Sequence, residues 1–494
     1  MKSELPKSWL TVPLGEITEI NPRHAKELDD SMLVSFATMA ALNEDKPTFQ
    51  FLEERPFGAV RKGFTHFAEG DVLFAKITPC MENGKGAVAI GLRNGLGCGT
   101  TELHVFRPHA GINPHYIYRF LAQPLIRREA KENFTGTAGQ ARVPTAFVEE
   151  LEIPLPPLGE QRRIMVKLEK LLTRMDVCQQ RFAKIKITLK RFRQSVLDAA
   201  ITGKLTLDWR SRHPVVDNAK NELESLLAIT ESQRPRKKQT EQEGEQQMLI
   251  EAMPKEWVTP TLGDLFRFID YRGKTPKRSE SGKRLISAKN IKMGYISEEP
   301  VEYVSEKIYQ SWMTRGFPKK DDIFFVTEGH TMGFVALNNR NDEFALAQRT
   351  ITLQPWQPIE MRCFFFFLMS SLFQNFIRLN ATGSAAVGIK ASRFRCLPIP
   401  FPSQAEQKEI VSRVESMFAL ADKIETRYMK AKVQVDKLPQ SILTKTFRGQ
   451  LVPQDPDDES AEKLLERILK MKKQEEFSNP QKTRSAKTIS AGKN

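Results

Sequence analysis

The sequence predicts an α+β protein made by tandem duplication, in which a mixed α/β module is followed by a long coiled-coil helix and the pair is then repeated. Three observations lead to this fold class. The chain of 494 residues matches itself at an offset near 247, two long stretches carry heptad spacing, and a charged polar stretch separates the copies. We expect the two long helices to pair antiparallel. A helical hairpin inside one globular core is the alternative.

The first module recurs in the second. Pro6-Lys7-Ser8-Trp9 returns as Pro254-Lys255-Glu256-Trp257, and Thr135-Gly136-Thr137-Ala138 returns as Thr382-Gly383-Ser384-Ala385. The best match aligns residues 153–206 with 399–452 without gaps, sharing a Pro-x-Pro entry, an internal Glu-Gln and a Gly-x-Leu exit. Two unrelated helices can share apolar spacing by chance, but not these three features in register. The sequence therefore predicts a duplication.

Each long helix is predicted to carry one narrow apolar stripe. Its residues recur at alternating steps of four and three, the a/d spacing of a coiled coil. The predicted stripes, which are also the predicted subunit interface, are Ile164, Leu168, Leu171, Met175, Phe182, Ile185, Leu189 and Phe192, and then Ile410, Val414, Met417, Ile424, Tyr428 and Val435. Pro439 has no proline counterpart in the first copy, and it predicts a break or restart of the second helix.

Composition points to a polyanionic partner. The formal net charge is +15, but it is uneven: residues 1–152 carry −2, residues 153–206 carry +8 and residues 254–398 carry +7. The five cysteines form no CxxC pair and the seven histidines show no zinc-ligand spacing, so we expect no bound metal and a reducing, cytoplasmic setting. The strongest apolar run, residues 363–373, is far shorter than the ~20 residues of a membrane span.

Together these features resemble the specificity subunit of type I restriction-modification enzymes, over residues 6–452. The resemblance implies the following division of the chain: 1–152 a first target-recognition domain, 153–206 a first spacer helix, 207–253 a polar linker, 254–398 a second target-recognition domain, 399–452 a second spacer helix, and 453–494 a C-terminal helix and basic tail, partly disordered.

The resemblance also implies a function and partners. Each recognition domain would read one half of a split site in double-stranded DNA, while the helices set the gap and bind two adenine-N6 methyltransferase subunits. Motor-nuclease subunits would complete the restriction enzyme. This chain would bind no cofactor, and S-adenosylmethionine, ATP and Mg would belong to the partner subunits. The alternative is a coiled-coil scaffold that binds DNA nonspecifically.

Candidate DNA-reading residues are polar or cationic and lie in predicted loops, because base edges are read by Arg, Lys, Asn and Gln, and phosphates are bound by Lys and Arg. The strongest candidate is the turn 271–278, which holds four cations in eight residues. Solvated basic loops and hairpin turns use the same residue types. The candidates are Lys76, Asn83, Lys85, Gln140, Arg142, Arg272, Lys274, Lys277, Arg278, Thr327, His330 and Lys390.

Catalytic motifs are not found in the sequence. The Pro156-Pro157 pair lies between leucines and not in the Asn/Asp-Pro-Pro-aromatic tetrapeptide of an adenine methyltransferase. Gly273-Lys274-Thr275 lacks the glycine that a phosphate-binding loop needs five positions earlier, where Phe268 stands. We therefore expect no catalytic residue in this chain and assign catalysis to the partners.

Overall fold

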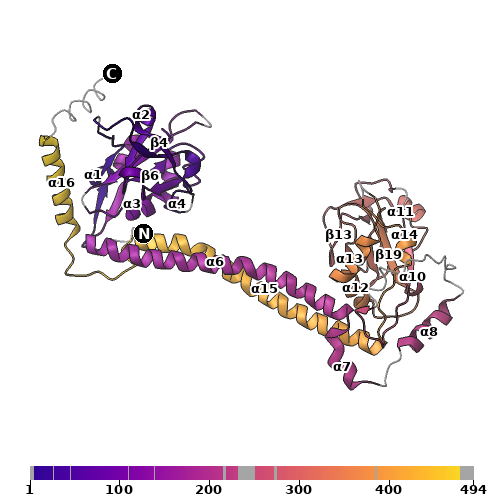
Figure 1. Ribbon diagram of the computed structural model, residues 1–494. Coiled ribbons are helices and arrows are strands. Elements are labelled where there is room, and N and C mark those ends of the chain that lie inside the picture. Colours follow the sequence, from indigo (N-terminus) through magenta and orange to yellow (C-terminus); the bar gives the residue numbers. More distant parts are fainter. Residues whose placement is uncertain are drawn as a thin grey trace. The chain divides into compact units, whose positions relative to one another are not determined.

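The computed structural model describes residues 5–25, 27–44, 46–109, 111–137, 140–214, 219–231, 251–271, 275–383 and 387–478 (Figure 1). The chain divides into two compact units. The first unit comprises residues 1–181 and 430–494, and the second comprises residues 182–429. Each unit therefore contains one α/β module and parts of both long helices.

The first module is built on two four-stranded sheets and a short two-stranded ribbon. One sheet has the order β2(Thr18–Ile20), β9(Leu103–Pro108), β6(Val72–Ala75), β7(Gly86–Val88), all antiparallel. The other has the order β4(Glu53–Pro56), β3(Leu33–Ala37), β8(Leu96–Gly99), β5(Thr65–Ala68), with β3 and β8 parallel. The ribbon pairs β1(Leu10–Pro13) with β10(Glu152–Leu155). The helices are α1(Leu14–Ile17), α2(Phe57–Val60), α3(Pro114–Leu121), α4(Pro124–Glu132) and α5(Thr145–Glu150), with single 3-10 turns at Met39–Ala41 and Arg93–Gly95.

The second module repeats the strand order of the first sheet, whereas its second sheet has three strands in place of four. Its first sheet runs β11(Phe266–Asp270), β19(Thr350–Pro355), β16(Ile323–Val326), β17(Val335–Leu337). Its second sheet runs β15(Tyr303–Val304), β12(Lys283–Ile286), β18(Phe344–Leu346), again with one parallel pair, β12 and β18. A hairpin, β13(Ile291–Lys292) and β14(Tyr295–Ile296), completes the strands. The helices are α10(Leu262–Leu265), α11(Glu306–Trp312), α12(Met361–Met369), α13(Ser371–Leu379) and α14(Ala391–Arg395).

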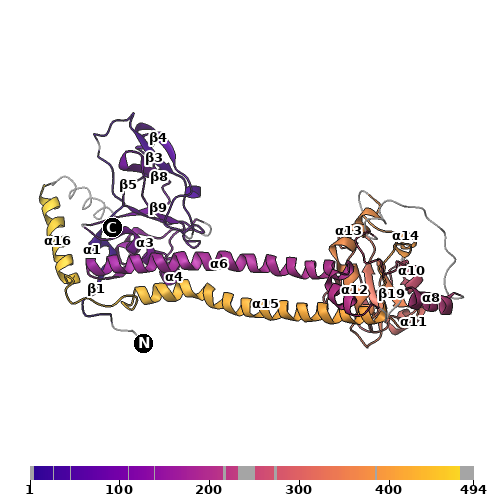
Figure 2. The same ribbon diagram turned by 60° about the horizontal axis from the view of Figure 1, so that its bottom comes forward.

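Two long helices, α6(Leu158–Ile201) and α15(Gln404–Thr446), lie side by side in both units (Figures 1 and 2). In the second unit they run antiparallel, because Phe182 stacks edge-on against Tyr428 whereas Arg193, further along α6, pairs with the earlier Asp422. In the first unit Ile164 and Leu168 of α6 share a core with Phe447, which directly follows α15. The predicted antiparallel pairing is thus present.

Pro439 does not break the second helix, contrary to the sequence prediction. The α15 helix continues through Pro439 to Thr446. Proline removes one backbone donor and crowds the preceding turn, but Ile442, Leu443 and Phe447 beyond it pack against the core of the first unit. This apolar packing offsets the missing hydrogen bond.

The predicted polar linker 207–253 also needs correction. After a 3-10 turn at Lys204–Thr206, it forms α7(Leu207–Arg212) and α8(Ala219–Thr230). Leu223 and Leu226 of α8 are buried in the core of the second unit. They lie three positions apart, on one helix face, which gives this segment an apolar stripe despite its charge. Residues 232–250 lie outside the described residues.

The C-terminal helix α16(Ala461–Ser478) occupies the corresponding place in the first unit. Its Leu464 and Ile468 join the core that contains Trp9 and α3. The Lys472 ammonium donates to the backbone oxygens of Gly15 and Glu16 at 2.8 and 3.0 Å. Each long helix is therefore followed by a shorter helix that packs within the same unit. The basic tail after residue 478 lies outside the described residues.

A glycine closes each long helix against the start of a module. Gly203 and Gly449 both adopt a left-handed backbone, with φ of 66° and 68°. A Cβ on Gly203 would collide with Pro254, and one on Gly449 would collide with Pro6. These contacts explain the Gly-x-Leu exit and the Pro-Lys-x-Trp entry found in both copies of the sequence.

Candidate nucleic-acid interface and helix surface

Two loops of the first module form one surface beyond the carboxyl end of β6. The loop after β6 lies against the loop that contains Thr135 and Arg142: the Thr78 amide donates to Ala141 at 3.1 Å, and the Val143 amide donates to Lys76 at 2.9 Å. Ile77 and Arg142 also form an isolated β-bridge. The sequence candidates Lys76, Gln140 and Arg142 are therefore brought together, although they come from segments far apart in the chain.

Arg142 is ion-paired within the module. Its Nε and Nη2 atoms donate to the two carboxylate oxygens of Glu102 at 2.8 and 2.9 Å. This hydrogen bonding from Arg142, together with the nearby charge of Lys76, lowers the pKa of Glu102. Such a bidentate pair holds the guanidinium in a fixed orientation. The Nη1 atom of Arg142 also donates to the backbone oxygen of Gln140 at 2.9 Å, so Glu102 and Gln140 together fix the guanidinium.

The other candidates of this module divide into exposed and structural residues. Asn83 and Gln140 are exposed, and the Asn83 amide reaches Glu44 at 3.5 Å. Lys85 is half-buried, and its ammonium donates to the backbone oxygen of Met39 at 3.2 Å. Lys85 thus ties the loop to the preceding segment, which leaves Asn83 and Gln140 better placed for contact with DNA.

The matched loops of the second module also meet, but Thr327 does not face outward. Its side chain is buried and its hydroxyl donates to the backbone oxygen of Arg349 at 3.2 Å. The Ile389 amide donates to Thr327 at 2.8 Å, which joins the loop after β16 to the one that ends in Lys390. The prediction that Thr327 faces a DNA groove is wrong, because its side chain is buried and its hydroxyl is bonded to the backbone of Arg349.

His330 and Lys390 are exposed on this second surface. Beside them lies Arg349, whose Nε atom pairs with Glu328 at 3.1 Å. Glu102 and Arg349 hold the same place, directly before β9 and β19, but they pair with different loops: Arg142 lies in the 135–143 loop and Glu328 in the loop after β16. Arg349 was not among the predicted residues, because it directly precedes a strand and no motif marks it. Its left-handed backbone, with φ of 76°, is the feature that sets it apart.

Residues 275–278, the described end of the basic turn, lie elsewhere in the second module. Arg272 and Lys274 fall outside the described residues. Lys277 is exposed, and Arg278 pairs with Glu302 at 3.2 Å. The adjoining Ser279 amide donates to Tyr303 of β15, so this turn borders the second sheet and not the loops after β16. The second module thus offers two separate groups of candidate residues.

The apolar seam of the helices follows the predicted stripe only in part. Ile164, Leu168, Met175, Leu189, Ile410 and Val414 are buried, and Leu171, Phe182, Ile185, Met417, Tyr428 and Val435 are half-buried. Phe192 and Ile424, however, are 36% and 43% exposed. At both places the next residue, Arg193 or Glu425, makes the contact with the other helix, because a straight helix drifts from a strict seven-residue repeat.

Arg193 forms a polar contact across the helix pair at this point. Its Nη2 atom lies 2.7 Å from both Asp422 Oδ1 and Glu425 Oε2. The equivalent positions of the other repeat hold Pro439 for Arg193 and Gln179 for Glu425. This ion pair is therefore a feature of the second unit alone, and polar groups in a seam are known to fix helix register.

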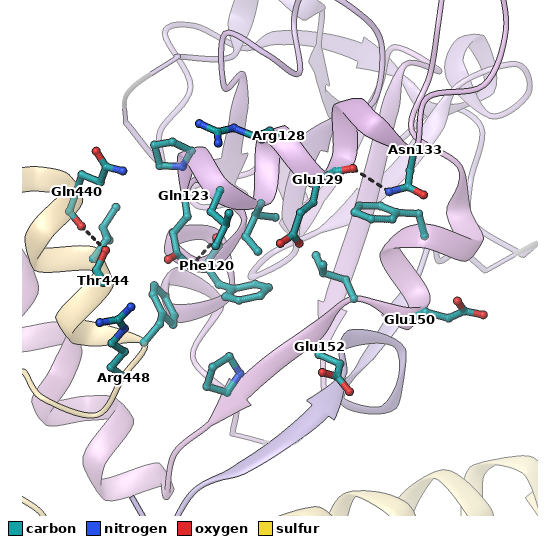
Figure 3. A pocket seen from close by; sticks show the side chains of 18 of the residues that line it. Phe120, Gln123, Arg128, Glu129, Asn133, Glu150, Glu152, Gln440, Thr444 and Arg448 are labelled. Atoms are coloured by element: carbon teal, nitrogen blue, oxygen red, sulfur yellow. Dashed lines mark hydrogen bonds between the residues drawn. The ribbon is translucent and has the colours of Figure 1, made fainter. Parts of the chain in front are cut away.

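The junction between module and helix differs between the two units. In the second unit the Asp198 carboxylate of α6 accepts hydrogen bonds from the Ser371 amide and hydroxyl at 2.7 and 2.6 Å. In the first unit the corresponding residues are Thr444 and Pro124, and a pocket of about 1110 Å³ lies there. Figure 3 shows Gln440, Thr444 and Arg448 on one side of it. Glu129, Asn133, Glu150 and Glu152 lie on the other.

The described part of the chain contains no group of three or more His, Cys, Asp or Glu side chains that could hold a metal ion. Nor does it contain a helix with the length and apolarity needed to cross a membrane. The free cysteines Cys98 and Cys363 are buried, and burial raises the pKa of both thiols, which disfavours the reactive thiolate.

Comparison with known proteins agrees with this architecture. The family model described as "Type I restriction modification DNA specificity domain" matches residues 6–186 and again residues 254–434. The chain belongs to this family and carries its domain twice.

Among relatives, the type I restriction enzyme EcoAI specificity subunit of Escherichia coli is 26% identical over 469 residues, covering 85% of this chain and 79% of its own. The StySPI specificity subunit of Salmonella potsdam is 30% identical over 374 residues, covering 73% and 72%. The crystal structure of the HsdS subunit from Thermoanaerobacter tengcongensis has the same fold, with a TM-score of 0.62 at 18% identity, covering 91% of this chain and 99% of that one.

Proposed function

We propose that this chain is the non-catalytic recognition subunit of a type I restriction-modification enzyme, and that each module reads one half of a bipartite DNA site. The observation that carries the proposal is the repeated loop surface. Each module presents loops beyond the carboxyl end of the same strand, β6 or β16, and the same backbone hydrogen bond joins them in both, from Val143 to Lys76 and from Ile389 to Thr327. Two copies of one surface with different exposed residues suit two different half-sites.

The partners follow from the same proposal. The long helices set the gap between half-sites and bind two adenine-N6 methyltransferase subunits. Motor-nuclease subunits join this complex to complete the restriction enzyme. S-adenosylmethionine, ATP and Mg are bound by those partners in the cytoplasm. The helix pair supports this view, because α6 and α15 continue from one unit into the other and expose apolar residues such as Val166, Leu420 and Val433.

The experiment is expression of the chain with its methyltransferase subunit in a host that lacks adenine methylation, followed by genome-wide mapping of N6-methyladenine. One motif with two fixed halves and a constant gap is the expected result. The alternative function, a scaffold that binds DNA nonspecifically, predicts methylation without a motif and a salt dependence of DNA binding that is equal on every sequence. The chain without its partner should not transfer methyl groups to DNA.

A further inference from the structure

A groove on the first turns of α6 is open in the first unit and covered in the second. It has a volume of about 500 Å³. Residues from α6 and from the segment after α15 line it: Arg162, Arg163, Val166, Lys167, Lys170, Leu451, Val452 and Pro453. Val166 is 72% exposed at its centre. The groove therefore combines an apolar floor with a cationic rim.

In the second unit the corresponding surface, on the first turns of α15, is covered by a segment of the same chain. Lys167 corresponds to Arg413, and Leu451 corresponds to Leu205. Arg413 is bound by Asp208, in the first turn of α7, with Nη1–Oδ1 and Nη2–Oδ2 distances of 2.5 and 3.1 Å. Arg413 also donates to the backbone oxygen of Leu205 at 2.8 Å. An acidic residue on a helix of the same chain thus neutralises the cation in this copy.

In the first unit the residue that corresponds to Asp208 does not contact Lys167, the counterpart of Arg413. Gln454, the counterpart of Asp208, donates to Glu160 at 2.6 Å. The following acidic residues, Asp455 and Asp458, pair with Arg163 at 3.8 and 2.6 Å. Within the described residues no ion pair reaches Arg162, Lys167 or Lys170, all of which are exposed. The rim of the open groove therefore keeps an uncompensated positive charge.

The spacing of the cations indicates what fits beside them. Arg163, Lys167, Lys170 and Arg174 recur at steps of four, three and four, which places them along one face of α6. Val166 and Val177, 72% and 42% exposed, flank this stripe. Heptad spacing matches a second helix running along the first, and exposed valines gain nothing from a phosphate backbone. The chain's own tail, residues 479–494, has no Asp or Glu and cannot compensate the charge.

We infer that this basic groove docks an acidic amphipathic helix of one methyltransferase subunit, and that the second unit, where Asp208 already covers Arg413, has no equivalent dock. The inference rests on the proposed function. The two methyltransferase subunits are consequently held with different strength and different salt dependence. The subunit on the first unit contributes an ionic contact that the other does not have.

The test measures how many methyltransferase subunits remain bound to the full chain, by native mass spectrometry at increasing NaCl. The variant is Lys167→Glu/Lys170→Glu, and both positions are exposed, so folding should be preserved. Lys184→Glu/Lys186→Glu, also exposed on α6, is matched in charge change. Lys167→Arg/Lys170→Arg keeps the charge. We expect the first variant to lose one of two subunits with at least tenfold weaker affinity, and both controls to keep two.

Val166→Asp separates the apolar floor from the cationic rim, and it should weaken binding of one subunit as well. Equal stoichiometry and salt dependence in Lys167→Glu/Lys170→Glu and Lys184→Glu/Lys186→Glu would overturn the inference. Two retained subunits with a reduced salt slope of DNA binding would also overturn it, because the stripe would then contact DNA. Failure of the unmodified chain to bind any methyltransferase subunit would instead refute the docking part of the proposed function.

Discussion

The indole of Trp9 donates a hydrogen bond to Glu160 at 2.8 Å, and in the second unit Trp257 makes the same bond to Glu406 at the same distance. Both carboxylates are buried. Each bond links the entry segment of a module to the first turn of a long helix. The pairing explains why this Trp and this Glu recur in both copies of the sequence.

Trp9→Phe should destabilise the first unit more than Trp257→Phe destabilises the second. Without its tryptophan, Glu160 keeps one side-chain donor, Gln454, whereas Glu406 keeps Thr206 and Arg210. A buried carboxylate that loses a donor costs about 1–3 kcal/mol. Hydrogen exchange of the first turns of α6 and α15 reports the two sites separately. Equal changes in exchange at both would contradict this account.

Asp198→Ala should loosen the junction between α6 and α13 in the second unit. The carboxylate accepts from both the amide and the hydroxyl of Ser371, so its removal leaves two donors unpaired, at about 1–3 kcal/mol. Thr444→Ala is the matched control in the first unit, where the hydroxyl bonds only to Gln440 within its own helix. We expect faster amide exchange at the start of α13 in the first variant and little change at α4 in the second.

The stability of the second unit should depend on Asp322. Burial raises the pKa of this carboxyl from 3.8 to about 6. The folded state therefore holds the proton more tightly than the unfolded state, and the stabilisation present below pH 4 is lost as pH rises through 6. The difference corresponds to about 3 kcal/mol.

Asp322→Asn should abolish this pH dependence. Urea unfolding at pH 4 to 7 can be followed by tryptophan fluorescence, since four of the five tryptophans lie in the second unit. Asp321→Asn is the neighbouring control, and it should keep most of the dependence. A flat profile in the unmodified chain would show that Asp322 is ionised throughout.

The duplication, the sheet-bearing modules and the helix pair could all be predicted from the sequence, because they depend on repeated motifs and on apolar spacing. Arg349 and Glu328 could not, since their pairing is created by two loops that meet only after β16 and β19 align. Thr327 was misjudged for the same reason: a threonine in a loop has no sequence feature that distinguishes a buried loop-joining hydroxyl from an exposed one.

The local sequence pattern gave a wrong prediction at two other positions, Ile424 and Pro439. Ile424 fits the heptad register, yet it is exposed, and the neighbouring Glu425 contacts Arg193 of the other helix. Pro439 predicts a break, yet the apolar residues beyond it are anchored in a core that the local sequence does not show. In both, contacts with distant segments outweigh the local preference.

The basic turn of the second module should affect one half-site alone. Alanine at Arg272, Lys274, Lys277 and Arg278 removes four cations from a segment that belongs entirely to the second unit. The expected methylation map keeps one half of the motif and relaxes or loses the other. Gln140→Ala/Arg142→Ala, in the first module, should change the opposite half. Loss of discrimination at both halves in either variant would argue against independent reading by the modules.

The gap between half-sites should follow the length of the helix pair, and insertion of seven residues after both Gln179 and Glu425 tests this. Seven residues return the apolar stripe to the same face. They lengthen each helix by roughly 10 Å at ~1.5 Å per residue, which corresponds to about three base pairs at ~3.4 Å each. The same number of base pairs turns the far half-site by about 100°, given ~10.5 pairs per turn, so affinity should fall.

Insertion of three residues at both places is the control, since it rotates the stripe out of register and should prevent assembly. The expected map shows both half-sites unchanged around a longer gap. An unchanged gap in an assembled, active enzyme would mean that the spacing is set within the modules or by the methyltransferase subunits, and that α6 and α15 serve only to join them.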